Sequence, residues 1–118
     1  MITSYRNSLD EIAQQGGMLG CAIVETESGM VVEAAGDEAW AARAEAAVDF
    51  WRLYERRADL RPLGPPRAAV LIHPECRITL TSCGARMVLI CFSSEPDTMD
   101  WPAWKLNVGR LTAATRSI

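Results

Sequence analysis

The segment Ala85–Ser93, with the sequence ARMVLICFS, decides how the rest of the chain folds. Every residue from Met87 to Phe92 is apolar, whereas a strand with one face in water would alternate apolar and polar residues. A strand covered on both faces instead reads as a continuous apolar run of about this length. We therefore expect a central strand of a sheet, with other structure packed on both of its faces.

Two further strands are predicted directly before this segment. AAVLI (68–72) and the alternating CRITLTS (76–82) are separated by the turn residues His73-Pro74-Glu75. Cys83-Gly84 is predicted to form the turn from the second of these strands into the central strand. The three strands then make an antiparallel meander.

The N-terminal third of the chain is predicted to be a helix followed by a β-hairpin. Apolar residues recur at spacings of four and three from Tyr5 to Ile12, which favours an amphipathic helix over residues 3–15, and Gly16-Gly17 ends it. A capping box of Ser8 and Glu11 would instead begin a shorter helix. In LGCAIVETESGMVVEAAG (19–36), two runs rich in Val, Ile and Ala flank Glu27-Ser28-Gly29, where glycine supplies the positive φ of a hairpin turn.

A long helix is predicted in the middle of the chain. Asp37 has the side chain of an N-cap, and no Gly or Pro follows until Pro62, in a proline-rich loop. When the residues are placed at steps of about 100° around the helix, the charged ones share one arc. This arc holds Glu45, Asp49, Arg52, Arg56 and Asp59.

The remainder of this helix is apolar over an unusually wide arc. One apolar sector holds Ala39, Ala42, Ala46, Phe50 and Leu53. The other holds Trp40, Ala44, Ala47, Val48 and Trp51. A surface helix that packs on one sheet needs an apolar stripe only a little over ~100° wide. We therefore expect the helix to have a second packing partner, although the pattern leaves open which sector faces the sheet.

A final helix completes the predicted order of elements. Asp100 is placed to cap it, and Pro102 lies in its first turn, where the missing N–H costs nothing. Its apolar side is predicted to consist of Trp101, Trp104, Leu106, Val108 and Leu111. The order α-β-β-α-β-β-β-α predicts an α+β fold in which five antiparallel strands lie between helix layers. Residues 1–118 are expected to form one domain, because no linker or repeat divides them.

Size and charge exclude several classes of function. The 118 residues are 49% hydrophobic and carry a formal net charge of -3, which does not suit neutralisation of nucleic-acid phosphates. The N-terminal residues lack the apolar core of a signal peptide, and no segment approaches the roughly 18 apolar residues that a bilayer requires. We expect a cytoplasmic protein that binds no nucleic acid and does not insert into a membrane.

The histidine and cysteines do not indicate a catalytic or metal centre. His73 and Cys76 form a single closely spaced pair, whereas structural zinc sites usually bring two such pairs together. Cys76 is in phase with Ile78 and Leu80, so its side chain is expected to point into the core. No residue near His73 in the sequence offers a nucleophile and an orienting carboxylate. We expect no cofactor, no metal and no enzymatic activity.

Arginines gather after the middle of the long helix, and two interpretations of them differ. The cluster consists of Arg52, Arg56, Arg57, Arg61 and Arg67. A solvated face balanced by Glu55 and Asp59 is favoured over a site for an anion or an acidic partner.

Three features together resemble one known family. They are the order of the elements, the hairpin that follows a Gly-rich helix end, and the segment NVGRLTAAT (107–115) in the last helix. Almost all of residues 3 to 116 is similar to the Roadblock family of dynein light chains and their prokaryotic relatives. The last helix of that family typically carries an Asn-x-Gly-x-x-x signature, which Asn107, Gly109 and Leu111 match.

The resemblance implies a specific assembly. The long middle helix would cover one face of the sheet and the terminal helices the other. Two copies would form a homodimer in which the middle helices pair and the third strands meet edge to edge. By carry-over the dimer interface would hold Trp40, Ala44, Val48 and Trp51 from the helix and Ala68, Ala69, Val70, Leu71 and Ile72 from the strand.

Family members are mostly not enzymes, and they bind small Ras-like GTPases, either as GTPase-activating dimers or as scaffolds. The resemblance therefore implies a GTPase regulator or adaptor. The candidate partner-binding residues are Glu45, Asp49, Arg52 and Arg56 on the charged arc.

Two rival functions stay open on the sequence. Sheets flanked by helices also hold ligands in the similar profilin-like and PAS-like folds, and the cysteines with Met87 could line a cavity for a small molecule. The chain offers no convergent set of polar residues for such a ligand. A dimer with a purely structural place in a larger assembly would differ from the GTPase adaptor only in its partner.

Overall fold

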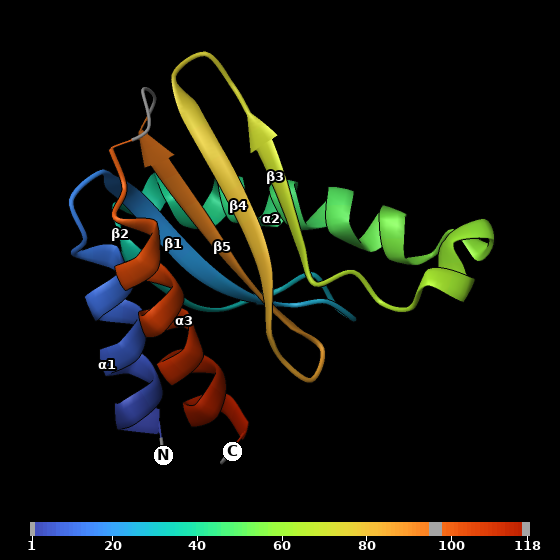
Figure 1. Cartoon of the computed structure of the whole chain (residues 1–118), viewed down its shortest axis with the longest axis horizontal. Helices are drawn as coiled ribbons and strands as arrows, with labels where there is room; N and C mark the ends of the chain where they lie inside the picture. Colours follow the sequence, from blue (N-terminus) through green and yellow to red (C-terminus); the bar gives the residue numbers. More distant parts are fainter. Residues whose placement is uncertain (1, 95–97, 117–118) are drawn as a thin grey trace.

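The computed structural model describes residues 2–94 and 98–116 and contains one sheet with helices on both faces (Figure 1). In chain order the elements are α1 (Ile2–Ala13), β1 (Met18–Glu25), β2 (Val31–Gly36), α2 (Glu38–Glu55), the 3₁₀ helix η1 (Ala58–Leu63), β3 (Ala68–Ile72), β4 (Cys76–Gly84), β5 (Met87–Ser94) and α3 (Trp101–Arg116). This confirms the predicted α+β order, with η1 as an addition.

The five strands form a single antiparallel sheet in the order β2-β1-β5-β4-β3. The predicted central strand is confirmed, because β5 is bonded to β1 on one side and β4 on the other. Its residues from Val88 to Ser93 are all buried. The continuous apolar run therefore reflects cover on both faces of the sheet.

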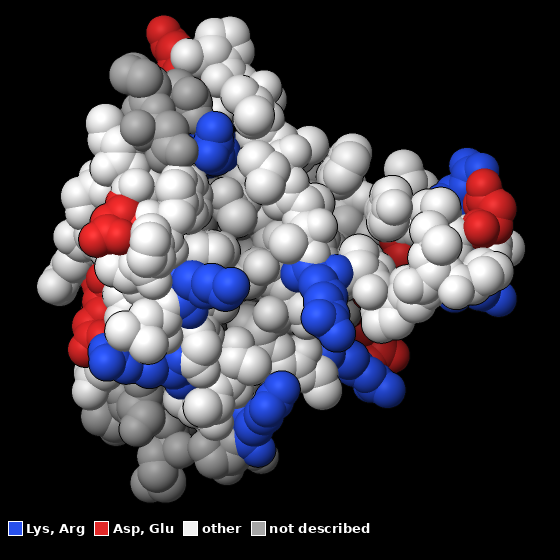
Figure 2. Space-filling view, viewed as in Figure 1, with Lys and Arg blue, Asp and Glu red and all other residues white. Residues whose placement is uncertain are grey.

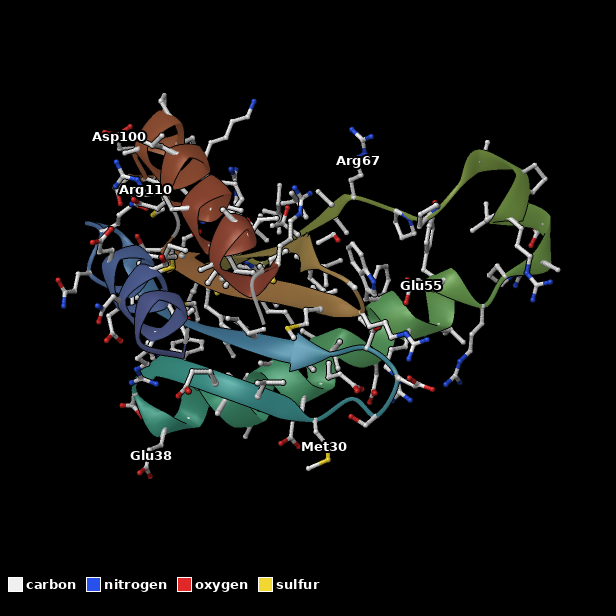
Figure 3. All side chains as sticks on the ribbon, turned by 90° about the horizontal axis from the view of Figure 1, so that it is seen from below. Met30, Glu38, Glu55, Arg67, Asp100 and Arg110 are labelled. Atoms are coloured by element: carbon white, nitrogen blue, oxygen red, sulfur yellow. The ribbon has the colours of Figure 1, made fainter. Side chains whose placement is uncertain are left out.

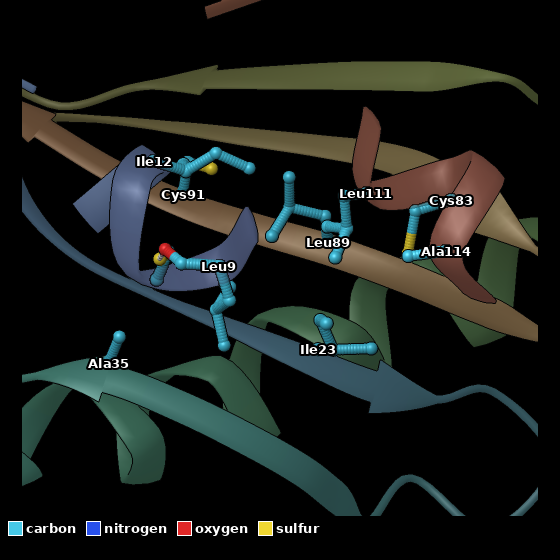
Figure 4. Close-up of a cluster of buried hydrophobic side chains, with 10 residues drawn as sticks. Leu9, Ile12, Ile23, Ala35, Cys83, Leu89, Cys91, Leu111 and Ala114 are labelled. Atoms are coloured by element: carbon cyan, nitrogen blue, oxygen red, sulfur yellow. Dashed lines mark hydrogen bonds between the residues drawn. The ribbon is translucent and has the colours of Figure 1, made fainter. Parts of the chain in front are cut away.

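The first layer is formed by α1 and α3, which lie side by side on one face of the sheet (Figure 1). Leu9 and Ile12 from α1 and Leu111 from α3 are completely buried there. They pack on side chains of β1, β4 and β5 that include Ile23 and Leu89 (Figure 4). At ~25 cal/mol per Å² of apolar surface, each such side chain contributes about 2 kcal/mol by leaving water.

The second layer is α2 alone, which crosses the opposite face of the sheet (Figure 1). Ala44, Val48 and Trp51 are buried against a cluster of strand residues that includes Ile90 and Phe92. Asp37 begins the helix as predicted, because its carboxylate accepts a hydrogen bond from the Ala39 N–H at 3.0 Å. The arrangement of helices that the family resemblance implied is therefore present.

The predicted end of the middle helix is wrong. The helix ends at Glu55 rather than continuing towards Pro62, and Arg57 is already extended before η1 begins. No side chain of α2 after Trp51 is buried, so the last turn has lost the packing that stabilises a helix. The end of α2 and η1 therefore extend beyond the sheet as an arm next to β3 (Figure 1).

The turn between β4 and β5 also differs from the prediction. Cys83 is fully buried and Gly84 is still in β4, so the turn residues are Ala85 and Arg86 instead of Cys83-Gly84. Arg86 has a φ of 61°, a left-handed conformation that is uncommon for residues other than glycine. Its guanidinium pairs with Glu27 at 2.8 Å, next to the β1–β2 turn.

The last helix begins as predicted, but one of its apolar residues faces water. Asp100 accepts a hydrogen bond from the Ala103 N–H at 3.1 Å and so caps α3. Leu111 is buried, and Trp104 and Val108 pack against the same core cluster. Leu106 is 59% exposed, so its assignment to the apolar side was wrong. It lies between the residues that contact the sheet on a helix of 3.6 residues per turn.

Candidate protein-interaction surface

One apolar sector of α2 packs against the sheet of the same protomer. Ala44 and Val48 have no exposed surface, Trp51 is 2% exposed, and the ring of Trp40 lies 4.9 Å from that of Phe92 between centroids. These helix residues were predicted at a dimer interface. The sheet of the same protomer covers Ala44, Val48 and Trp51 instead, so the prediction is wrong for these three, whereas Trp40 is half-buried and borders a groove next to α2.

The other apolar sector of α2 faces outward. Ala39, Ala42 and Ala46 are exposed, Phe50 is 48% exposed and Leu53 is 66% exposed. Single exposed apolar residues are ordinary, but a helix that repeats them along one side presents a continuous apolar stripe. The sequence analysis predicted a second packing partner for α2 because of this additional apolar sector.

The strand β3 is an edge strand with no protection against further pairing. Within residues 2–94 and 98–116 it is hydrogen-bonded to β4 only and ends the sheet, so its outer N–H and C=O groups have no strand partner there. Natural edge strands are usually blocked by charges, prolines or bulges, and AAVLI contains none of these. Val70 is 51% exposed and Ile72 is 67% exposed. This strand is therefore ready to accept another strand.

Grooves join the outer stripe of α2 to β3. A groove of about 870 Å³ runs beside Ala46, Phe50 and Leu71, and a smaller one of about 260 Å³ continues along Phe50, Tyr54 and β3. We call this the α2–β3 surface and define it by Ala46, Phe50, Tyr54 and the β3 residues Ala68, Ala69, Val70, Leu71 and Ile72. Tyr54 was missed in the sequence, although its spacing of four from Phe50 places it on the same side of the helix.

The charged side of α2 lies away from β3, and its four predicted partner-binding residues do not share one environment. Glu45, Asp49 and Arg56 are exposed. Arg52 is different, because its side chain is only 22% exposed and donates a hydrogen bond to the Glu27 carbonyl at 2.9 Å. Arg52 therefore ties the β1–β2 turn to α2, and the accessible charges are the other three.

Solved structures of other proteins superimpose on nearly the whole chain. MglB of Myxococcus xanthus matches 98% of this chain and 98% of its own, with a TM-score of 0.79 and 15% sequence identity. A Roadblock/LC7 domain from Streptomyces avermitilis matches 96% of this chain and 92% of its own, with a TM-score of 0.75 and 15% identity. The chain has the Roadblock fold. No protein-family model and no curated protein sequence matches it.

A third similar structure is of an MglB in a tetrameric arrangement. It matches 93% of this chain and 83% of its own at a TM-score of 0.71 and 16% identity. At these identities the comparisons establish the fold of the Roadblock domain alone. Within the part of the chain that the structure describes, no helix is long and apolar enough to cross a bilayer.

Three of the four cysteines of this chain are core residues. Cys21, Cys83 and Cys91 are buried with α1 and α3, and burial raises the pKa of the Cys83 thiol to about 12. Burial and the neighbouring Cys21 also raise the pKa of Cys91, whose sulfur accepts a hydrogen bond from the Trp104 indole at 3.4 Å. The rival hypothesis placed the cysteines around a cavity, and of the four only Cys76 borders one of the grooves described above. Met87 also packs against this cluster.

His73 and Cys76 lie at the β3–β4 turn, as the sequence predicted. The His73 N–H donates to the Cys76 carbonyl at 2.8 Å, which closes the hairpin. Among residues 2–94 and 98–116, no group of three His, Cys, Asp or Glu side chains is placed to hold a metal ion. Cys76 is half-buried and borders the larger groove.

Thiol labelling checks this placement. At about pH 8 in native protein, Cys76 is expected to react with a thiol reagent first, because the other three thiols are buried and the reagent cannot reach them. Mass spectrometry after brief labelling should find the modification on Cys76, and unfolding in denaturant should release all four cysteines. Early labelling of Cys21 or Cys91 would contradict the described core.

Proposed function

We propose that the α2–β3 surface is covered by a second copy of this chain. The observation that carries the proposal is an unprotected apolar edge strand next to a groove bordered by half-exposed Phe50. Both parts belong to one continuous surface, so a single partner can cover both. The tetrameric arrangement reported for a similar MglB structure supports self-association of this fold.

A symmetric dimer meets the needs of both elements at once. In an isologous contact each β3 would pair with the other β3 in antiparallel orientation, which satisfies the outer backbone groups of both strands. The two α2 helices would then lie next to each other, with Phe50 and Tyr54 of each filling the groove of the other. The sheet would continue from one protomer into the other.

We further propose that this dimer is an adaptor or regulator that binds a small Ras-like GTPase. The proposal follows the function implied by the Roadblock resemblance. The charges of Glu45, Asp49 and Arg56 support it, because they lie on the side of α2 away from β3 and stay accessible in such a dimer. A depression of about 320 Å³ continues this side past Glu55 and Arg56 to the β1–β2 turn.

Charge reversal on α2 tests GTPase binding. A Glu45→Lys/Asp49→Lys variant is expected to bind a Ras-like GTPase from the same cell, loaded with a non-hydrolysable GTP analogue, about tenfold more weakly than the wild type. Isothermal titration calorimetry gives the affinity, and light scattering checks that the mass of the Roadblock protein is unchanged.

The control is Glu11→Lys, which reverses one acidic charge on α1, on the opposite face of the sheet. It should leave the affinity for the GTPase within about twofold of the wild type. Equal loss of affinity in both variants would show that general charge, rather than the α2 surface, controls the interaction. Full binding by the α2 variant would remove the proposed site.

A further inference from the structure

A further groove lies on the other face of the sheet, between α3 and the strands β3 and β4. It has a volume of about 700 Å³ and runs between Arg67 and Ala68 on one side and Lys105, Gly109 and Arg116 on the other. In Figure 2, Lys and Arg side chains gather around the hollow next to α3. Arg67 points to the α3 side of the sheet, away from α2 (Figure 3). We call it the α3 groove.

The α3 groove carries positive charge that the described chain does not balance. Arg67, Lys105 and Arg116 are all exposed, and none of them forms an ion pair with any residue in 2–94 or 98–116. Elsewhere on the molecule, Arg86 pairs with Glu27 and Arg110 with Glu11. The chain as a whole is acidic, with a net charge of -3. Three unpaired cations around one groove therefore favour an acidic ligand.

Gly109 adds an independent reason to expect a ligand there. A glycine inside a helix costs about 0.5–1 kcal/mol relative to alanine, so such a glycine usually serves a close contact. Within the described chain no such contact exists, because a Cβ at Gly109 would meet nothing within 4 Å. The residue lines the groove and is exposed. The missing side chain leaves room for a partner's backbone to approach α3.

The lining of the groove combines hydroxyl groups of Thr81, Ser82 and Thr112 with an apolar part, and the apolar part continues beyond the groove. Val108 and Trp104 line it from α3, and Ala68 lines it from β3. Val70 and Ile72 share the face of β3 with Ala68, because residues two apart in a strand point to the same side, and both are half or more exposed. A ligand that fits must combine acidic groups with apolar ones.

We propose that the α3 groove binds an acidic, partly apolar polypeptide segment of a partner protein. Carboxylates of the segment would pair with Arg67, Lys105 and Arg116, its apolar side chains would lie on Ala68 and Val108, and its backbone would pass Gly109. A second copy of this chain is disfavoured as occupant, because it would bring the same cations against each other. The site shares Ala68 with the α2–β3 surface but opens on the α3 side of the sheet, and it rests on neither dimer formation nor GTPase binding.

Model peptides with one varied charge test the proposal. Three fluorescent peptides of about 16 residues, enough to span the groove, share one pattern of Leu and Ala and carry Glu, Gln or Lys at the remaining positions. Fluorescence anisotropy at low salt is expected to show binding of the Glu peptide at least about tenfold tighter than the Gln peptide, and no binding of the Lys peptide. The affinity for the Glu peptide should fall as salt is raised from about 50 to 300 mM.

Variants of the protein locate the bound peptide. Arg67→Glu/Lys105→Glu is expected to weaken binding of the Glu peptide about tenfold or more, and Gly109→Leu to weaken it similarly without loss of helix stability. Arg61→Glu reverses an exposed arginine of η1, far from the groove, and should bind as the wild type does. The Phe50→Glu variant should also bind the Glu peptide normally, which separates this site from the α2–β3 surface.

Three results would overturn the proposal. The first is that the Arg67→Glu/Lys105→Glu variant binds the Glu peptide as tightly as the wild type does. The second is that the Gly109→Leu variant does so. The third is absence of Glu-peptide binding together with binding to vesicles of phosphatidylglycerol and phosphatidylcholine, which would assign the cations to a membrane surface. In the expected case, amide shifts in NMR spectra change at Gly109, Thr112 and Thr81, which line the groove.

Discussion

A Phe50→Glu substitution is expected to convert the protein from a dimer into a folded monomer. Phe50 is 48% exposed in the single chain, so a glutamate there stays in water and costs the monomer little stability. In the proposed dimer the same carboxylate would be buried without a partner in the groove next to β3, which costs several kcal/mol. The dissociation constant of the dimer should rise by about 100-fold or more.

Sedimentation velocity at about 10 μM should give twice the chain mass of 13.0 kDa for the wild type and 13.0 kDa for Phe50→Glu. The control is Leu106→Glu on α3, since Leu106 is an apolar residue with a similar exposure of 59% on the other layer. It should remain a dimer. A Phe50→Glu protein that keeps the mass and the circular dichroism spectrum of the wild type would place the dimer contact elsewhere.

Trp51→Ala is expected to have the largest effect on folding. Trp51 follows Phe50 in the chain but points the other way, and only 2% of its surface is exposed. Removing a buried tryptophan costs about 3–5 kcal/mol, because the lost contacts add to the cavity left behind. A domain of this size has roughly 5–15 kcal/mol of stability in total, so the variant should be partly unfolded at 37 °C or aggregate.

Trp51→Phe separates packing from hydrogen bonding at the same position. The indole N–H of Trp51 is buried and has no hydrogen-bond partner within the described residues. Phenylalanine removes that unpaired donor and keeps most of the ring, so the loss should be only about 1 kcal/mol. Urea unfolding followed by circular dichroism measures both variants. Equal midpoints for Trp51→Ala and the wild type would show that α2 does not hold the second core together.

The contrast between exposed Phe50 and buried Trp51 could not be predicted from the sequence. The width of the apolar arc on the middle helix correctly indicated more apolar surface than the sheet covers, because the sector with Phe50 and Leu53 stays exposed. Either sector could have faced the sheet, because the sequence pattern of a helix carries no information on how the helix is rotated over a distant strand. The orientation depends on contacts such as that between Trp40 and Phe92, which are far apart in the chain.

Features of the fold with strong local causes were predicted well. The apolar run of β5 identified the central strand, and Asp37 and Asp100 cap the helices that they were expected to cap. The turn at Ala85 and Arg86 was missed, because Arg86 adopts a positive φ without being a glycine. The early end of α2 was missed too, since it follows from the edge of the sheet rather than from a Gly or Pro in the helix.

Some residues of the candidate surfaces were also predicted from the sequence, and others were not. The edge strand Ala68–Ile72 was predicted at an interface from the Roadblock resemblance, and the structure places it as an unprotected edge. Arg52 was expected to contact a partner protein, but its hydrogen bond to Glu27 spans 25 positions in the chain and has no signal in the local sequence. Gly109 was used only as a family signature, and its open position in a groove became apparent from the structure.

Hydrogen–deuterium exchange of β3 tests the central claim, that a second copy covers the α2–β3 surface, most directly. If two β3 strands pair, the amides of Ala68–Ile72 should be protected at about 10 μM and exchange faster on dilution towards the monomer or in Phe50→Glu. The amides of β5, buried in the middle of the sheet, provide the internal reference, because their protection should not change with concentration. Fast exchange of half of the β3 amides in a sample with the mass of a dimer would show that the strand edge is free and would contradict the account.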